Sequence, residues 1–318
     1  MARGLLFGRQ AVVTLGSLAV SNPASLDPSF RLRDFRAEGF RISFKIVKTA
    51  SGKPDTLELS IYNLSTEHRR ELTNSGMTVE VAAGYPDNIA VIFRGKADAV
   101  LSGRDTSSVD WVTTVKAGDG ERELRQGRIN LSLRPGTRII DAITQAAQQL
   151  GLDAKDALDK ARASGLSYTD SIQQVLSGGV LQGSAQKVMN QLLKSTGASW
   201  SVQDEHIVIV PKNSTSDEPT VLLAADTGLI GSPELTKPDP KEAAAGDGGE
   251  GGEEGGTAGA SQLNVIKVRS LLQPQIKPYG KVKIDAENLE GLFRAEKVTH
   301  EGDTHGQPWY TDIELTAL

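Results

Sequence analysis

The chain has 318 residues, 38% of them hydrophobic and 24% charged, so it is long enough for two or three domains with their own cores, and disorder throughout is excluded. It contains no cysteine, which excludes disulfide bonds, thiolate zinc sites, iron–sulfur clusters and cysteine nucleophiles. Its 35 basic and 40 acidic side chains give a net charge of −5, which argues against a protein whose main role is to bind nucleic acid phosphates.

The N-terminus superficially resembles a signal peptide, because Arg3 and Arg9 precede an apolar run over residues 11–20. Gly8, Thr14, Gly16 and Ser17 interrupt this pattern, and residues 11–15 read equally well as a strand. We therefore expect no cleavage, with a periplasmic envelope protein as the alternative. No apolar stretch approaches the roughly 20 residues that a membrane-spanning helix needs, so we expect no membrane insertion of this chain.

The first third of the chain reads as β-rich. Hydrophobic and polar residues alternate over 40–46 and again over 57–61, on either side of a turn at 52–55, which predicts two strands with one buried face. A short helix is predicted over 63–72, with Ser65 or Thr66 as its N-cap. Further strands are predicted over residues 78–83, 89–100 and 109–117. Many short strands separated by turns indicate an antiparallel barrel or sandwich.

The hydrophobic period changes after about residue 128. Apolar residues three and four apart predict helices over 139–150, capped by Gly151, and over 184–196, with Ser184 as N-cap and Gly197 at its end. Residues 199–202 and 207–210 then read as a hairpin. This middle part is predicted to be a compact α+β module.

Residues 246–259 are mostly glycine with acidic residues among them, and nothing there can be buried to offset the entropy of ordering. Gly246, Gly248 and Gly251 formally match a dinucleotide fingerprint, but no strand precedes them and no helix follows. The neighbouring carboxylates would also repel a pyrophosphate. A flexible linker is the better interpretation.

Four more strands are predicted after this linker, over residues 263–269, 281–285, 292–299 and 309–316. The expected fold class is therefore mainly β, with two antiparallel tube-type β-barrel or sandwich domains and an inserted α+β module. The expected domains are a first barrel over 1–127, the module over 128–215, a connecting segment over 216–262 and a second barrel over 263–318. We find no convincing sequence repeat, so any similarity between the two β-rich ends would be structural only.

The sequence contains few motifs that are typical of catalysis or metal binding. Residues 300–305 are predicted to be a turn, and this turn holds two imidazoles and two carboxylates. It is a candidate metal site, although Gly302, Asp303 and Gly306 are also ordinary turn-forming residues between two strands. His68 and His206 have no chemical partner in sequence and are predicted to be surface residues. Trp111 and Trp200 lie on strand patterns and are predicted to be core or interface anchors. We therefore assign no catalytic, cofactor-binding or metal residues, and we expect no cofactor and no enzymatic activity.

Several stretches taken together resemble the baseplate hub proteins of contractile-tailed bacteriophages. They cover both β-rich ends, about half of the chain, and are residues 6–10 (LFGRQ), 41–46 (RISFKI), 59–65 (LSIYNLS), 81–85 (VAAGY), 92–95 (IFRG), 270–278 (SLLQPQIKP), 298–304 (VTHEGDT) and 309–311 (WYT). No single stretch is diagnostic, but their order and spacing together are fairly specific. The middle module and the acidic linker match only loosely.

This resemblance implies a structural protein of the virion tail baseplate, assembled in the host cytoplasm. Hubs of this family carry two tube-type barrels in each chain, so that a homotrimer joins a sixfold tail tube to a threefold spike and lets DNA pass without binding it specifically. The implied partners are tube or tube-initiator proteins, the spike protein and other baseplate subunits. The alternatives are a hub-carried protein that binds or degrades peptidoglycan through residues 128–213, or the periplasmic envelope protein.

Overall fold

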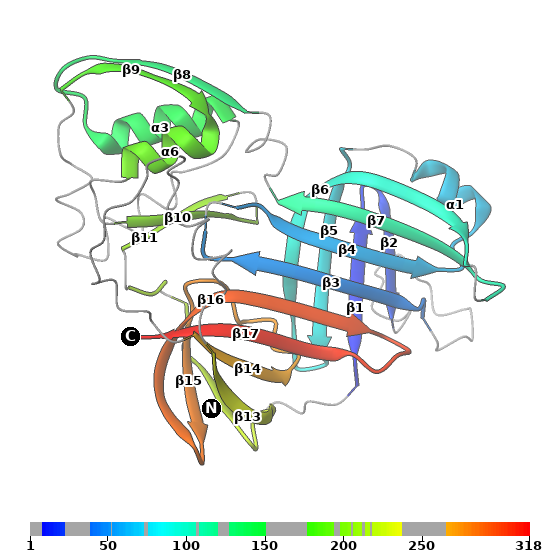
Figure 1. Ribbon diagram of the computed structural model, residues 1–318. Helices are drawn as coiled ribbons and strands as arrows, with labels where there is room; N and C mark the ends of the chain where they lie inside the picture. Colours follow the sequence, from blue (N-terminus) through cyan, green and yellow to red (C-terminus); the bar gives the residue numbers. More distant parts are fainter. Residues whose placement is uncertain are drawn as a thin grey trace, which may run out of the picture.

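The computed structural model describes residues 8–22, 39–51, 53–72, 76–105, 108–119, 127–150, 177–193, 198–204, 206–211, 214–216, 218–236 and 265–318. Strands dominate it, and one sheet of 13 strands contains most of them (Figure 1). Within these residues no helix is long and apolar enough to cross a membrane. The predicted mainly antiparallel β fold with an inserted α+β module is confirmed.

One order of five strands occurs twice in this sheet. In the N-terminal block the order is β3-β4-β7-β6-β5, and in the C-terminal block it is β13-β14-β17-β16-β15, with every neighbouring pair antiparallel. The N-terminal strands are β3 (Ile42–Thr49), β4 (Asp55–Tyr62), β5 (Thr78–Tyr85), β6 (Asn88–Arg104) and β7 (Trp111–Asp119). The C-terminal strands are β13 (Leu229–Thr236), β14 (Val265–Leu271), β15 (Lys281–Ala286), β16 (Leu289–Asp303) and β17 (Trp309–Ala317). The two β-rich ends of the chain therefore share one connectivity.

The longest strand of each block carries a bulge at the matching place. The register of β6 against β7 shifts between Ala97 and Ala99, and that of β16 against β17 shifts between Ala295 and Lys297. Aligning these bulges places Trp309 at the position of Trp111. It also aligns two polar pairs, since the side chains of Ser102 and Thr113 are 2.9 Å apart and those of His300 and Thr311 are 3.0 Å apart.

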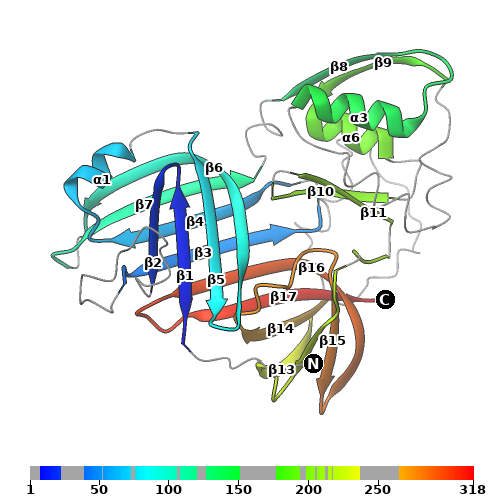
Figure 2. The same cartoon turned by 180° about the vertical axis from the view of Figure 1, so that it is seen from behind.

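The two blocks join edge to edge, because residues 297–303 of β16 pair antiparallel with residues 43–49 of β3. The strands β13, β14, β17, β16, β3, β4, β7 and β6 thus follow one another in a single curved layer, with β13 and β6 at its two ends (Figures 1 and 2). Each block still has a hydrophobic core of its own. This continuous sheet was not predicted from the sequence.

Each block also has elements that the other lacks. In the N-terminal block β1 (Gln10–Leu15) pairs with β5 and with β2 (Leu18–Asn22), and the helix α1 (Thr66–Glu71) connects β4 to β5. In the C-terminal block β12 (Val221–Ala224) pairs in parallel with β15. The strands β5, β1 and β2 cross behind the curved layer in Figure 1 and in front of it in Figure 2.

The inserted module forms three layers. A ribbon of β8 (Arg128–Leu133) and β9 (Gly179–Ser184) packs on the helices α3 (Ile139–Leu150) and α6 (Ala185–Leu193). The hairpin of β10 (Ala198–Gln203) and β11 (His206–Pro211) covers the other side of the helices and lies between them and the strands of the two blocks, which together are called the barrel (Figure 1). Module residues form a hydrophobic core separate from those of the two blocks.

Most predicted elements are present, and local chemistry explains their ends. Ser65 is the N-cap of α1, because its hydroxyl accepts a hydrogen bond from the backbone N–H of His68. Ser184 occupies the same place before α6. The predicted helix caps Gly151 and Gly197 and the glycine-rich stretch 246–259 lie outside the described residues. The strands β2, β8, β9, β12 and β13 were not predicted.

One prediction about the C-terminal hairpin was wrong. We took residues 300–305 to be a turn, but residues 300–303 are the end of strand β16 and the turn lies after Asp303. The strand continues because His300 and Gly302 fit the buried face: Gly302 pairs with Phe44 and has no side chain to clash with that ring.

Candidate functional site

A cluster of buried charges lies where the inner faces of three neighbouring strands end. Lys48 continues the inward row of β3 after Ile46, and Asp55 precedes Leu57 on the inward row of β4. Asp119 ends the inward row of β7 and pairs with Asp55 across the two strands. All three residues are buried, in positions where the alternation of the strands would otherwise place apolar side chains.

The hairpin β10–β11 supplies the partner of the buried lysine. Asp204, at the tip of the hairpin, accepts a hydrogen bond from Lys48, with 2.9 Å between its Oδ1 and Nζ of the lysine. The carboxylate of Asp55 is 4.0 Å from the same ammonium group, and Lys277 lies 3.7 Å from the second oxygen of Asp204. Lys48 and Lys277 thus both link the barrel to Asp204 of the module.

Burial and charge act against each other at these groups. Burial alone would lower the pKa of Lys48, but the carboxylates of Asp204 and Asp55 outweigh it and raise that pKa. Burial would raise the pKa of Asp204, but the Lys48 ammonium and its hydrogen bond lower it below the ordinary value. At Asp55 burial dominates, Lys48 opposes it and Asp119 reinforces it, so the pKa is well above the ordinary value. The cluster therefore favours the charged forms of Lys48 and Asp204 and disfavours the ionised form of Asp55.

Further buried polar side chains lie where the module meets the barrel. Ser201 and Gln203 are buried on the strand β10, and the amide of Gln203 donates to the hydroxyl of Ser201. On the barrel side, Tyr279 is fully buried and donates from its hydroxyl to the carbonyl of Ala50. Burial is the main reason that the pKa of Tyr279 is raised. Tyr279 is also hydrogen-bonded to Ser201. Module and barrel therefore meet through this hydrogen bond and the two ion pairs of Asp204, while apolar contacts stabilise each part internally.

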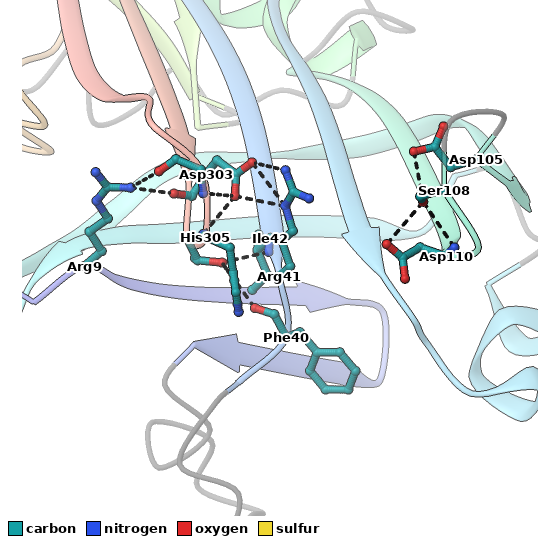
Figure 3. Close-up of polar contacts among 11 residues, drawn as sticks. Arg9, Phe40, Arg41, Ile42, Asp105, Ser108, Asp110, Asp303 and His305 are labelled. Carbon is teal, nitrogen blue, oxygen red and sulfur yellow. Dashed lines mark hydrogen bonds and ion pairs between the residues drawn. The ribbon is translucent and has the colours of Figure 1, made fainter.

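A second polar cluster ties the N-terminal strands to the turn between β16 and β17 (Figure 3). The carboxylate of Asp303 accepts hydrogen bonds from the guanidinium of Arg41, at 2.8 Å at the shortest, and from the backbone N–H groups of His305 and Gly306 at 2.9 and 2.8 Å. Arg9 donates to the backbone carbonyls of Asp303 and Gly306. Burial would raise the pKa of Asp303, but the Arg41 guanidinium and the backbone N–H groups of His305 and Gly306 lower it below the ordinary value.

The structure separates the two histidines of the candidate metal site. His300 is fully buried inside the sheet beside Thr311, whereas His305 is exposed on the turn and contacts Thr304. Burial, assisted by the Lys48 charge, lowers the pKa of His300 to about 3, so it is neutral at ordinary pH. In the described part of the chain no three metal-ligating side chains come close enough to hold an ion.

The other residues singled out from the sequence lie apart from both clusters. His68 is on α1, and His206 is an exposed residue at the start of β11. Trp200 is buried in the module core and donates from its indole to Asn190 at 2.7 Å. Trp111 is half-buried, with the guanidinium of Arg69 stacked 3.9 Å from its ring centroid.

Sequence reasoning missed the charged cluster, although a signal for it was present. Extending the alternation of residues 40–46 by one step places Lys48 on the buried face, and extending that of 57–61 backwards does the same for Asp55. Asp204 had no such signal, because a hairpin tip is normally exposed.

Several solved structures have a fold similar to that of this chain. The chain matches a 43 kDa tail protein of prophage MuSo2 from Shewanella oneidensis, with 10% identity, a TM-score of 0.59 and 98% of both chains covered. It matches a tail protein from Neisseria meningitidis MC58 with 10% identity and a TM-score of 0.61, covering 98% of this chain and 97% of that one. No family model and no curated protein sequence matches the chain.

A third solved structure extends the similarity beyond phages. The E. coli c3393 protein, described as a component of the type VI secretion system with structural similarity to the T4 tail proteins gp27 and gp5, matches with 8% identity and a TM-score of 0.53. This match covers 87% of the present chain and 73% of the other. The chain therefore shares its fold with these tail proteins. The family resemblance seen in the sequence is confirmed at the level of the fold.

Proposed function

We propose that the protein is a structural baseplate hub of a contractile phage tail, without enzymatic activity. It would form a trimeric ring between a sixfold tail tube and a threefold spike. The proposal includes its position in the virion and its assembly in the host cytoplasm. It also keeps a first barrel over 1–127 and an inserted module over 128–215, and it assigns the strands β12 and β13 of the segment 216–262 to the second barrel, because they pair with β15 and β14.

The observation that carries this proposal is the repeated strand order. Each chain presents the order β3-β4-β7-β6-β5 and its counterpart β13-β14-β17-β16-β15, joined edge to edge through β3 and β16. Three such chains around a threefold axis present six similarly connected blocks. A ring of this kind offers matching surfaces to a sixfold partner on one side while it keeps threefold symmetry on the other.

The similar structures support this role, since they are tail proteins and a secretion-system component with structural similarity to tail proteins. A further match is to a chain of a Francisella PdpA–VgrG complex, at 6% identity and a TM-score of 0.57, and it covers 58% of that chain. We propose tube, spike and neighbouring baseplate subunits as partners. A net charge of −5 suits a bore that DNA crosses, because tight phosphate contacts would slow its passage.

The mass of the purified chain in solution tests the proposal. Light scattering coupled to size exclusion should give three times the chain mass of 33.8 kDa, at least at high concentration. A chain that stays monomeric over the accessible concentration range, and that binds neither tube nor spike subunits of its own tail, would contradict it.

A further inference from the structure

Within one chain, the two blocks are joined by strand pairing between β16 and β3, and this pairing is a model for contacts between blocks of different chains. Residues 297–303 of β16 extend past the end of β15, and β3 pairs with them there. In this register His300 lies opposite Ile46. Because each strand covers the other, the exposed fraction of Ile46 is 0% and that of His300 is 1%.

The same part of the N-terminal block has no described strand beside it. The pairing of β6 with β5 ends at Lys96, and β7 covers only the opposite edge of residues 96–104. Asp98 and residues 101–104 are accordingly exposed, and Leu101 reaches 68%. The bulge alignment makes residues 99–105 the counterpart of residues 297–303, with Ser102 at the position of His300.

The C-terminal block shows the complementary edge. The strand β13 is the counterpart of β3, and within the described residues it pairs only with β14. Leu235 pairs with the core residue Ile266, as Ile46 pairs with Leu57, so Leu235 takes the position of Ile46. Its exposed fraction is nevertheless 64%, which is the value expected for an inward-facing residue whose flanking strand is absent.

We infer that β6 of one copy pairs antiparallel with β13 of the next copy and so reproduces between chains the β16–β3 joint seen within one chain. This inference rests on the proposed ring. The equivalence fixes the register, with Ser102 opposite Leu235 of the next copy, Gly103 opposite its Glu234 and Leu101 opposite its Thr236. The pairing covers Leu235 with the neighbouring chain and completes the inner row of the C-terminal block.

The positions of the two edges suit a closed ring. They lie at opposite ends of the curved layer of strands (Figure 1), so each copy offers one edge to the copy on each side. Such a head-to-tail contact is heterologous and closes when the rotation between copies divides a full turn. The bulge between Ile230 and Glu234 of β13 corresponds to the single residue Phe44 of β3, so regular pairing is expected only over residues 234–236.

Cysteine cross-linking tests the register directly, because the natural chain has no cysteine. The double variant S102C/L235C places two thiols at directly opposed positions, where a disulfide needs Cα atoms within about 7 Å. Mild oxidation should give a covalent species of three chains on a non-reducing denaturing gel, with nothing larger, and reduction should return the single chain. Either single variant, and the pair S102C/K283C with its second thiol on β15, should stay unlinked.

A charge substitution gives a second readout that does not depend on oxidation. Leu235→Asp alters a side chain that is mostly exposed in the single chain, so the melting temperature of the monomer should not change while the trimer is lost. Val180→Asp is the matched control, since Val180 is 66% exposed on the module strand β9, and this variant should remain trimeric. A wild-type trimer that resists both the cross-link and Leu235→Asp would overturn the pairing alone, and a chain that stays monomeric would overturn the ring as well.

Discussion

Asp55 and Asp119 occupy directly opposed positions on the strands β4 and β7, and both side chains are completely buried. Two carboxylates on directly paired residues of neighbouring strands repel each other when both are ionised. The Lys48 ammonium group near Asp55 compensates for part of this charge, and Asp204 on the module uses that same ammonium group. The barrel core is therefore coupled electrostatically to the docked module.

The variant Asp55→Asn should increase stability relative to the natural protein as the pH rises. The folded-state pKa of Asp55 is raised, so its contribution is fully present below the unfolded pKa and is lost as the pH rises through the folded value. An amide keeps the acceptor for the backbone N–H of Thr49 and has no proton to lose. Denaturant unfolding at several pH values between 4 and 8 should show the difference growing by at most about 1.4 kcal/mol per pH unit. A difference that is constant with pH would show that Asp55 is ionised throughout.

The variant His300→Gln should lose part of the acid sensitivity of the fold. The pKa of His300 is lowered to about 3, so between that value and its ordinary value the unfolded chain binds a proton that the folded chain excludes. Stability of the natural protein should therefore fall with pH in this window, with a contribution from His300 of up to about 1.4 kcal/mol per pH unit. Parallel unfolding free energies for both proteins from pH 7 to pH 4 would contradict this. His305→Gln, on the exposed turn, is the control and should leave the slope unchanged.

The variant Asp204→Asn should loosen the module without unfolding either part. Asp204 has a φ of 53°, a left-handed conformation that asparagine also tolerates, so the substitution removes the charge and preserves the turn. Spin labels on introduced cysteines at Lys45 and Gln186 should report one narrow distance in the natural background and additional longer distances in the variant. Because the folded pKa of Asp204 is lowered, the natural protein should show the same loosening only as the pH falls through that lowered value.

Two controls accompany this measurement. Asp141→Asn removes a carboxylate from an exposed pair with Arg138 on α3 and should leave the distance distribution unchanged. Labels at Lys45 and Lys283, both on the barrel strands, should stay at one distance in every variant. A single unchanged distance between Lys45 and Gln186 in Asp204→Asn would show that the ion pair does not hold the module.

The variant Gly302→Ala should destabilise the joint between the blocks. A Cβ atom there would overlap the ring of Phe44 and lie 2.8 Å from Cε3 of Trp309, and both rings are buried. Overpacking of this kind costs about 1–3 kcal/mol. Gly103→Ala, at the equivalent of residue 301 on β6, meets nothing within 4 Å and should stay within about 0.5 kcal/mol of the natural protein in thermal unfolding.

Alternation and helix periodicity were sufficient to predict most strands and both long helices, because each buries one face locally. The repeated strand order was harder to predict from the sequence. The equivalence of Trp111 with Trp309 and of Thr113 with Thr311 is seen only when the bulges at Ala97 and Ala295 are aligned. The charged cluster brings together residues 48, 55, 119 and 204, and only the fold places the hairpin tip beside β3. His300 was wrongly predicted to lie in a turn, because Gly302 and Asp303 are typical turn residues. The fit of Gly302 beside Phe44 depends on the strand β3, which is distant in sequence.

The most direct test of the hub proposal is the symmetry of the chain in an assembled tail. Cryo-electron microscopy of intact tails should show three copies in a closed ring between tube and spike, with six similar β blocks around the bore. A tail that lacks the chain, or that carries it in six copies or outside the tube axis, would contradict the proposal.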